Sequence, residues 1–190
     1  MTAQLPISSS TQLARFGAHE FWLLADSGAF TEFAKSELIE GEVWVVNAVH
    51  SRHARVHASL TADLVLAVRQ GKIPLIVYSR PSTALSDDSI AEPDIALARR
   101  ADGKAIPGKD VLLTIEISDS TLSFDLGRKA ALYARHGIPE YWVVDVEGKI
   151  IHQHWEPRAV GYAEVRQIAF GDEVVAKTVA GLTVATNGLG

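Results

Sequence analysis

The chain has 190 residues, a formal net charge of −5 and no cysteine, which excludes disulfide scaffolds, thiolate zinc sites, iron–sulfur clusters and cysteine nucleophiles. Apolar residues make up 47% of the chain and charged residues 22%, as in a globular protein and unlike a low-complexity chain. The acidic total argues against nucleic-acid binding through bulk charge, although it leaves room for a local basic patch.

The length favours one domain over residues 1–190, with residues 1–12 as a flexible, polar N-terminal tail. No uncharged apolar run is long enough to span a membrane, and the first residues lack a basic leader. We therefore expect a cytoplasmic protein without a membrane partner.

The first half of the chain shows two helical patterns and one hairpin pattern. Residues 18–27 carry apolar residues at helical spacing. Residues 36–48 indicate a β-hairpin that turns at Glu40-Gly41. A long helix is expected over residues 50–70. Its apolar stripe consists of Val56, Leu60, Leu64 and Ala67.

The second half is rich in short apolar segments. Strands are expected at residues 74–79, 93–98, 111–117, 141–146, 149–155 and 161–169, with a polar loop at residues 99–110. A helix is expected over residues 124–136, with Ser123 as its N-cap and Gly137 at its end. This order predicts an α/β (α+β) protein with a mixed central β-sheet, flanking helices and added β-hairpins.

Two carboxylates stand out in the apolar strands. Asp94 begins one strand and Glu116 lies near the end of the next, so neighbouring strands would bring both acids to one end of the sheet. Their hard oxygen atoms suit Mg²⁺ or Mn²⁺, which can polarise a phosphoryl oxygen and acidify a bound water. A nearby lysine, for which Lys129 is the candidate, would stabilise the charge that develops in phosphodiester hydrolysis.

Each of these residues also has an ordinary structural explanation. The Pro-Asp pair at Asp94 is typical of a turn or a cap. Burying Glu116 without a partner costs several kcal/mol, so an exposed edge strand or an internal salt bridge would also account for it. Asp125 and Lys129 are four residues apart on the predicted helix, and a surface ion pair is the simpler interpretation of that spacing.

Three histidines, His50, His53 and His57, fall on one face of the long predicted helix. Zinc is compatible with this spacing, but a polar helix face is the favoured interpretation because zinc pairs are usually four residues apart. His53 is also a candidate for contact with phosphate or water. His152 and His154 alternate along a predicted strand and are expected to face solvent.

Two segments have a local excess of basic residues and are candidates for phosphate contacts, with a mixed-charge surface as the simpler alternative. The first carries Arg52, Arg55, Arg69 and Lys72, and the second carries Arg99, Arg100, Lys104 and Lys109.

Taken together, three stretches resemble the Uma-type family of putative restriction endonucleases, in the PD-(D/E)XK nuclease superfamily. They are Ser36–Val46, Ser86–Arg100 and Leu113–Asp145, and the similarity extends over residues 18 to about 175. The resemblance implies a restriction-endonuclease-like domain over residues 18–175, with DNA as the partner and Mg²⁺ or Mn²⁺ as the cofactor.

The resemblance also implies roles for individual residues. Asp94 would be the Asp of the Pro-Asp motif and Glu116 the second acid. The plain superfamily pattern has a lysine two residues after that acid, where this chain has Ser118. The Uma-type family departs in the same way, so Lys129 on the following helix would supply the amine. Glu37 would complete the metal site with Asp94 and Glu116.

Several neighbouring residues remain open as additional site residues. Glu40 and Glu42 compete with Glu37, and a solvated hairpin face is the alternative for all three. Many family members have Ser-Pro-Ser-Thr after the motif acid, whereas residues 118–121 here are Ser-Asp-Ser-Thr. Asp119 therefore adds a carboxylate that is either a further ligand or a loop cap. His53 lies where the family tends to have a histidine that begins the long helix.

The sequence therefore predicts a metal-dependent endonuclease that hydrolyses DNA phosphodiester bonds through Asp94, Glu116 and Lys129. The acidic charge and the displaced lysine favour the alternative, a non-catalytic nucleic-acid-binding or oligomerisation module on the same fold. Hydrolysis of another phosphodiester at the same site is a third reading. The apolar segment of residues 149–170 offers a surface for a homodimer, although the sequence does not determine the oligomeric state.

Overall fold

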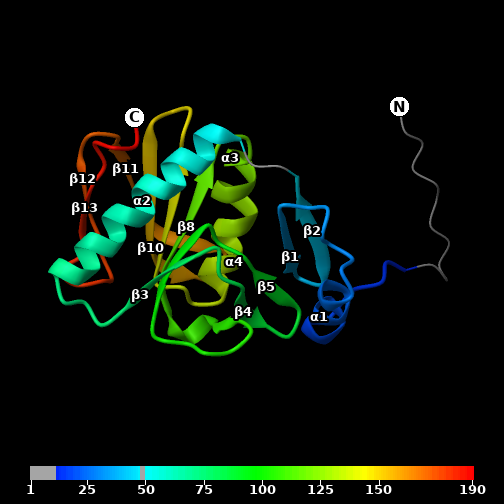
Figure 1. The fold of residues 1–190 in the computed structure, drawn as a ribbon. Coiled ribbons are helices and arrows are strands. Elements are labelled where there is room, and N and C mark those ends of the chain that lie inside the picture. Colours follow the sequence, from blue (N-terminus) through cyan, green and yellow to red (C-terminus); the bar gives the residue numbers. More distant parts are fainter. Residues whose placement is uncertain (1–11, 48–49) are drawn as a thin grey trace.

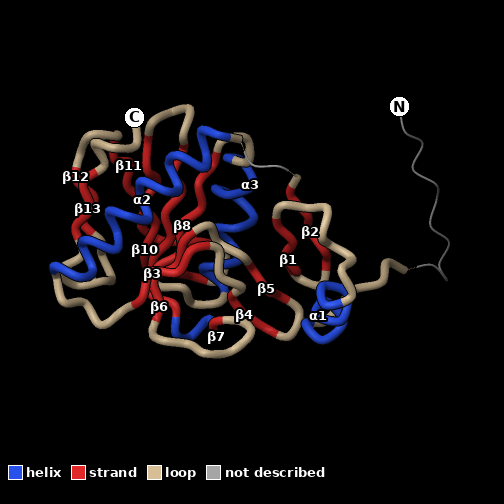
Figure 2. The backbone as a smooth tube through the Cα atoms, viewed as in Figure 1, coloured by secondary structure: helices blue, strands red, loops and turns tan. Residues whose placement is uncertain are grey.

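The computed structural model describes residues 12–47 and 50–190. The predicted tail therefore lies almost entirely outside the described residues, as does residue 48 of the predicted hairpin. Two β-sheets, a long helix and a shorter helical segment make up most of the described part (Figure 1, Figure 2). Within these ranges, no helix is long and apolar enough to cross a membrane.

The larger sheet has six strands in the order β11-β10-β9-β8-β6-β3. Only β8 and β9 pair in parallel, and the other neighbours are antiparallel. The sheet is therefore mixed, as the sequence predicted. Its strands are β3 (Ile76–Ser79), β6 (Ile95–Ala98), β8 (Val111–Ser118), β9 (Glu140–Asp145), β10 (Ile150–Arg158) and β11 (Gly161–Ala169).

One face of this sheet is covered by helix α2 (Ser51–Gln70), which crosses in front of the strands in Figure 1. Its buried stripe is Val56, Leu60, Leu64 and Val68, while the predicted Ala67 is only partly buried. These side chains join Leu113, Ile115 and Ile117 of β8 in one core cluster. Because side chains alternate along a strand, Thr114 and Glu116 point to the opposite face.

The opposite face of the sheet packs against a helical segment made of three short elements. These are α3 (Leu122–Phe124), a π-helical turn (Asp125–Lys129) and α4 (Ala130–Arg135). Tyr133 and Leu132 of α4 pack with Tyr141 and Val143 of β9. The segment begins two residues earlier than the predicted helix, after Thr121, so the N-cap prediction for Ser123 is wrong.

The second sheet has the order β2-β1-β5-β4-β7 and lies beside the first. Its strands are β1 (Lys35–Ile39), β2 (Glu42–Val46), β4 (Thr83–Ser86), β5 (Ser89–Ala91) and β7 (Ile106–Pro107). Glu40 and Gly41 both have positive φ (53° and 80°), as a two-residue hairpin turn requires, which confirms the predicted turn. The structure thus adds strands that the sequence did not predict.

Three further elements complete the described chain. Helix α1 (Ala18–Asp26) packs Phe21 against Leu38 of β1 and Ile90 of β5. A 3₁₀ turn (Gly108–Asp110) precedes β8 within the predicted polar loop. Strands β12 (Glu173–Val175) and β13 (Thr183–Ala185) form a small separate sheet that the sequence did not predict.

Candidate active site

Asp94 and Glu116 lie side by side at one end of β6 and β8. Ile95 pairs with Ile115 in an antiparallel register, so the next position along each strand places Asp94 opposite Glu116. Both side chains are nearly buried, with exposed fractions of 6% and 3%, and both line one pocket. The strands β6 and β8 are therefore neighbours, as the sequence-based prediction of this site required.

Glu37 reaches the same pocket from β1, and Lys35 accompanies it. The two residues alternate along the strand onto one face. Lys35 Nζ lies 3.2 Å from Glu116 Oε2 and 3.8 Å from Glu37 Oε2. Lys35 was not predicted from the sequence, although its spacing of two residues from Glu37 was the available signal.

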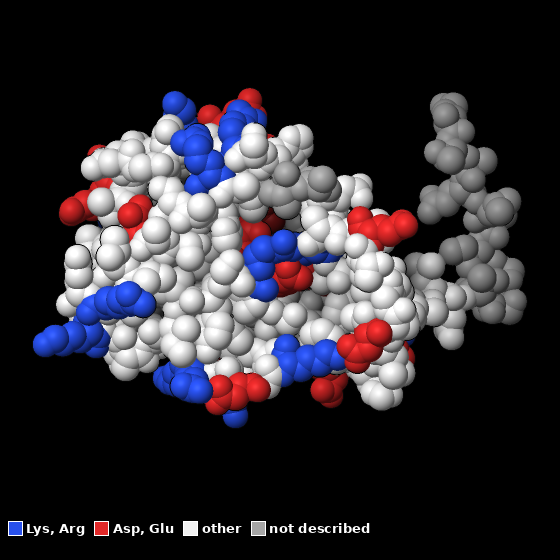
Figure 3. Space-filling model, in the orientation of Figure 1, with Lys and Arg blue, Asp and Glu red and all other residues white. Residues whose placement is uncertain are grey.

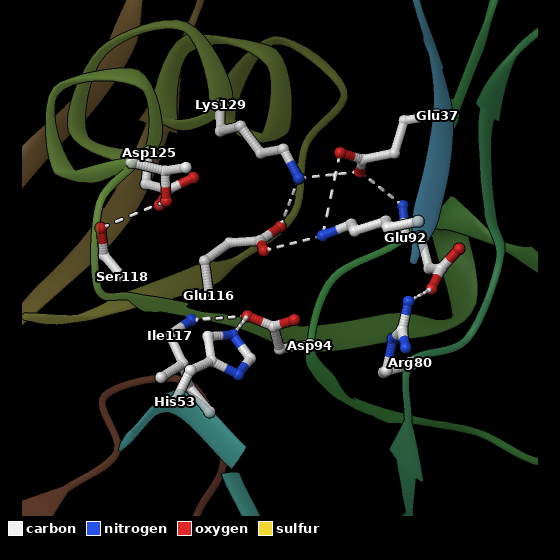
Figure 4. Close-up of polar contacts among 12 residues, drawn as sticks. Glu37, His53, Arg80, Glu92, Asp94, Glu116, Ile117, Ser118, Asp125 and Lys129 are labelled. Atoms are coloured by element: carbon white, nitrogen blue, oxygen red, sulfur yellow. Dashed lines mark hydrogen bonds and ion pairs between the residues drawn. The ribbon is translucent and has the colours of Figure 1, made fainter. Parts of the chain in front are cut away.

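Lys129 enters the pocket from the π-helical turn. Its Nζ lies 2.7 Å from Glu37 Oε1 and 2.8 Å from Glu116 Oε1, and its exposed fraction is only 2% (Figure 4). Asp125 is also buried and accepts a hydrogen bond from Thr121 Oγ1 at 2.5 Å. The predicted surface ion pair between Asp125 and Lys129 is therefore wrong. A π turn closes Ala130 N–H onto Asp125 O, which displaces side chains from ordinary α-helical spacing.

Glu116 is the centre of the polar network. Glu116 Oε1 also accepts a hydrogen bond from the hydroxyl of Tyr133 at 2.8 Å, so each of its oxygens has a partner. Burial raises the pKa of Glu116 to about 7, although Lys129 and Lys35 act in the opposite direction. For Glu37, burial also acts to raise the pKa, but the two lysines outweigh it and hold the pKa below its usual value.

Asp94 has a different environment from the two glutamates. Its Oδ2 accepts a hydrogen bond from Ile117 N–H at 2.8 Å and lies 3.1 Å from His53 Nε2 (Figure 4). Burial acts to raise the pKa of Asp94, but the contact with His53 and the charge of Lys35 outweigh it and hold the pKa well below its usual value. Asp94 is therefore ionised at neutral pH.

The donor set is chemically suited to a hard divalent cation. Asp94, Glu116 and Glu37 supply carboxylate oxygens to one pocket, which is the ligand type that Mg²⁺ and Mn²⁺ prefer. In the arrangement of the described residues, the acids do not converge as a ready cluster of three ligands. Lys35 and Lys129 contact the oxygens of Glu116 and Glu37 instead, so a cation would compete with two ammonium groups.

The pocket opens between the β1–β2 hairpin and the beginning of α2. Figure 3 shows a hollow near the centre of this face, where acidic and basic side chains meet. Arg52 pairs with Asp119 at 2.7 Å, and Arg80 pairs with Glu92 at 2.8 Å. Of these, Arg80 and Asp119 line the pocket.

Three of the additional candidates occupy different places. Asp119 lies in the pocket wall and is tied to Arg52. Ser118 is buried and contacts Thr121 Oγ1 at 3.3 Å. Glu42 lies away from the acids and pairs with Arg128 at 2.8 Å. The competitor Glu40 also contacts Arg128. Of the three hairpin glutamates, only Glu37 lines the pocket.

The histidines also separate into two groups. His50, His53 and His57 all line the pocket, and His57 Nε2 lies 3.0 Å from Asp94 O. Their contacts within the described residues do not form a zinc centre. His154, expected to face solvent, is 7% exposed and packs between aromatic rings, so that prediction is wrong. His152 is partly buried.

The second basic segment lies away from the pocket. Lys104 pairs with Asp26 at 2.6 Å, Arg99 with Asp110 at 3.9 Å and Arg100 with Asp102 at 3.3 Å. None of these basic residues is among those that line the pocket in the described part of the chain. The structure therefore does not bring this segment to the candidate site.

The model of the Uma2 family, whose description is "Putative restriction endonuclease", matches residues 20–187. The chain belongs to this family. This match confirms the resemblance seen in the sequence, and Glu37, Asp94 and Glu116 all lie within the matched range. No curated protein matches the chain in sequence.

Solved structures support the fold of this Uma2 family member. One is the crystal structure of a putative nuclease belonging to DUF820 from Anabaena variabilis ATCC 29413, with a TM-score of 0.62 and 16% identity. The match covers 81% of this chain and 88% of that one. It confirms the predicted restriction-endonuclease-like α+β fold.

A second solved structure is more distant. The type IIG restriction endonuclease BpuSI has a TM-score of 0.42 and 18% identity, over 72% of this chain and 15% of that one. This similarity is too low to support an argument about the site.

Proposed function

We propose that this protein is a metal-dependent endonuclease that hydrolyses DNA phosphodiester bonds with water as the nucleophile. The observation that carries the proposal is the placement of Asp94 beside Glu116 at the floor of an open pocket, with Lys129 Nζ 2.8 Å from Glu116. Membership of the Uma2 family, whose description is "Putative restriction endonuclease", supports it.

The residues have separate roles in this proposal. Asp94 and Glu116 would hold Mg²⁺ or Mn²⁺, with Glu37 as the third acidic residue. A divalent cation bound there would supply Lewis-acid polarisation of the phosphoryl oxygen and a more acidic water. Lys129 presents a fixed positive charge to the phosphate, where negative charge develops during hydrolysis. Tyr133 orients Glu116 and His53 orients Asp94, through the hydrogen bonds described above.

The alternative is a nucleic-acid-binding or oligomerisation module without catalysis. The observation that favours it is the internal neutralisation of Glu37 and Glu116 by Lys35 and Lys129. Such a network satisfies buried charges without any metal. The two proposals differ in metal uptake, because only the nuclease requires a cation at these carboxylates.

The test is cleavage of supercoiled plasmid and single-stranded DNA in the presence of Mg²⁺ or Mn²⁺. Glu116→Gln and Asp94→Asn preserve side-chain size and remove one charge. We expect each to lower the cleavage rate about a hundredfold or more, by analogy with the loss of one transition-state electrostatic contact. Glu173→Gln, the same chemical change on an exposed strand, serves as the preparation control and should cut like the wild type.

Two results would contradict the nuclease. Equal cleavage by wild type and Glu116→Gln would assign the activity to a contaminant or to another site. No cleavage by the wild type, together with no uptake of Mn²⁺ in calorimetry, would favour the non-catalytic module.

A further inference from the structure

We propose that the pocket accepts an unpaired segment of DNA, one of whose bases stacks on an aromatic platform formed by Trp44, Phe124 and Arg128. An intact duplex is then a poor ligand. This inference rests on the proposed function, since it names the form of DNA that the same site takes. The depth of the site, its aromatic wall and its charge each contribute to the argument.

The depth of the acidic groups restricts what reaches them. Glu116 and Lys129 are 3% and 2% exposed, so a scissile phosphate must descend to the pocket floor to meet them. Residues of the hairpin and of the beginning of α2 both contribute to the wall of the pocket. A duplex holds its phosphates on a stiff cylinder, with a persistence length of about 50 nm. An unpaired strand bends freely enough to lower one phosphate between these walls.

The hairpin register brings an aromatic side chain to this entrance. Glu37 pairs with Trp44, and Lys35 pairs with Val46. Directly opposed residues of an antiparallel pair project from the same face. Trp44 and Val46 therefore lie on the face of the hairpin that also carries the site residues Lys35 and Glu37.

Trp44 belongs to an exposed aromatic group beside the pocket. Its ring lies 5.0 Å from that of Phe124, which lines the pocket together with Val46. The Arg128 guanidinium lies 4.7 Å from the Trp44 ring centre. Trp44 remains 37% exposed, although a large aromatic side chain is normally more buried. Aromatic rings combined with arginine planes are the usual platform for unpaired bases.

The charges at the entrance favour stacking over extensive phosphate contact. Arg52, Arg80 and Arg128 are each paired with a carboxylate at 2.7 to 2.8 Å. A phosphate must displace an acid to use any of them. Because duplex binding depends on the neutralisation of several phosphates, these arginines and the net charge of −5 provide little for it. Base stacking does not require a phosphate to displace these carboxylates.

The experiment measures binding without metal, so that cleavage does not enter the result. Fluorescence anisotropy compares a labelled oligothymidylate with a labelled duplex hairpin of equal nucleotide number. We expect the wild type to bind the single strand about tenfold more tightly, with a shallow salt dependence. Trp44→Leu keeps an apolar side chain against Phe124 but removes the stacking surface, and should weaken single-strand binding about tenfold. Trp44→Tyr should restore most of it.

The matched control is Trp155→Leu. Trp155 also carries a nearby cation, with Lys177 Nζ at 5.3 Å, but it lies on β10 and does not line the pocket. Its variant should bind single strands like the wild type. Thermal unfolding of all variants identifies any that bind poorly because they are not folded. If Trp44→Leu is unfolded, the test is whether the folded Trp44→Tyr variant keeps the single-strand affinity of the wild type.

The outcomes separate this inference from the proposed function. Equal affinity for duplex and single strand, or an unchanged affinity in Trp44→Leu, overturns the inference even if Mn²⁺-dependent cleavage is found. Selective single-strand binding that depends on Trp44 supports the inference even if no cleavage follows. Equal binding of oligouridylate would overturn the assignment to DNA.

Discussion

At the residue scale, the candidate site is a cluster of buried side chains whose positive and negative charges neutralise one another. Lys35 and Lys129 each contact both Glu37 and Glu116, so two ammonium groups are shared by two buried carboxylates. Burial acts to lower the pKa of Lys35, but Glu116 and Glu37 outweigh it and hold the pKa well above its usual value. Lys35 is therefore charged at neutral pH, and the cluster depends on it.

Replacement of Lys35 by Met should expose the competition between lysine and metal. The variant leaves a buried negative charge without its partner, which should lower the free energy of unfolding in metal-free buffer by about 3 kcal/mol. A divalent cation then meets less positive charge, so Mn²⁺ should raise the melting temperature of Lys35→Met more than that of the wild type. Thermal unfolding with and without MnCl₂ measures both effects.

The control for this experiment is Lys109→Met, on the exposed 3₁₀ turn away from the pocket. It should resemble the wild type in both buffers. An Mn²⁺-induced shift that is the same in Lys35→Met and in the wild type would argue against a metal at Glu116.

At the element scale, the π-helical turn determines the direction in which the side chain of Lys129 points. An ordinary helix would place Asp125 and Lys129 together on one face, because residues four apart are neighbours there. The extra residue in the turn separates their partners, and Lys129 turns toward Glu37 and Glu116. Single π turns are frequent at functional sites. This turn brings a lysine to Glu116 although no lysine lies two residues after that acid.

A second local feature, the buried side chain of Glu140, connects the segment between β12 and β13 to the six-stranded sheet. Glu140 at the start of β9 is fully buried and accepts hydrogen bonds from Trp142 and Gln153. Its other oxygen accepts from Lys177 N–H, Thr178 N–H and Thr178 Oγ1 at 2.8 to 2.9 Å. The backbone between β12 and β13 is therefore held by one carboxylate.

Glu140→Ala should release this attachment. Several buried donors would lose their acceptor, at a cost of about 3 kcal/mol or more in the free energy of unfolding. Amide hydrogen exchange should accelerate first between residues 173 and 185, while α2 retains its protection. Urea unfolding and hydrogen exchange measure the two effects. Glu164→Ala, an exposed glutamate on β11, is the comparison, and an equal effect of both substitutions would contradict this role for Glu140.

At the scale of the whole molecule, stability should depend on a histidine distant from the site. His154 lies among Tyr141 and Tyr162, with ring centres 5.7 and 5.8 Å away. Burial lowers the pKa of His154 to about 4 from an ordinary value of 6.5. The unfolded chain therefore binds more protons at this position between pH 6.5 and 4, so stability falls as the pH is lowered through that range.

His154→Phe should remove this dependence while keeping an aromatic ring in place. We expect the acid-induced loss attributable to His154 to be about 1–2 kcal/mol, after allowance for partial solvent access. Urea unfolding at pH 7 and pH 4.5 compares the wild type with His154→Phe and with His19→Gln, an exposed histidine on α1. A wild-type pH dependence that persists in His154→Phe would show that other groups are responsible.

Local patterns in the sequence determined much of the fold. The stripe Val56, Leu60 and Leu64 predicted α2, and Glu40-Gly41 predicted the hairpin turn, because periodicity and turn chemistry depend on near neighbours. Short strands such as β4 and β5 escaped prediction, since three or four residues carry too little periodicity. The acids Asp94 and Glu116 were identifiable because carboxylates in apolar strands require partners.

Only the tertiary structure decided how these residues meet. Lys35, whose sole signal was its alternation with Glu37, joins the site because its side chain on β1 reaches Glu116 of β8 in the other sheet, a contact between residues 81 positions apart. Lys129 joins the site because a π turn changes the direction of its side chain. Residue spacing alone does not determine whether a helix forms such a turn. The burial of His154 likewise depends on rings from the two neighbouring strands, Tyr141 of β9 and Tyr162 of β11. The sequence thus identified most of the candidate residues, and long-range packing determined which of them share one pocket.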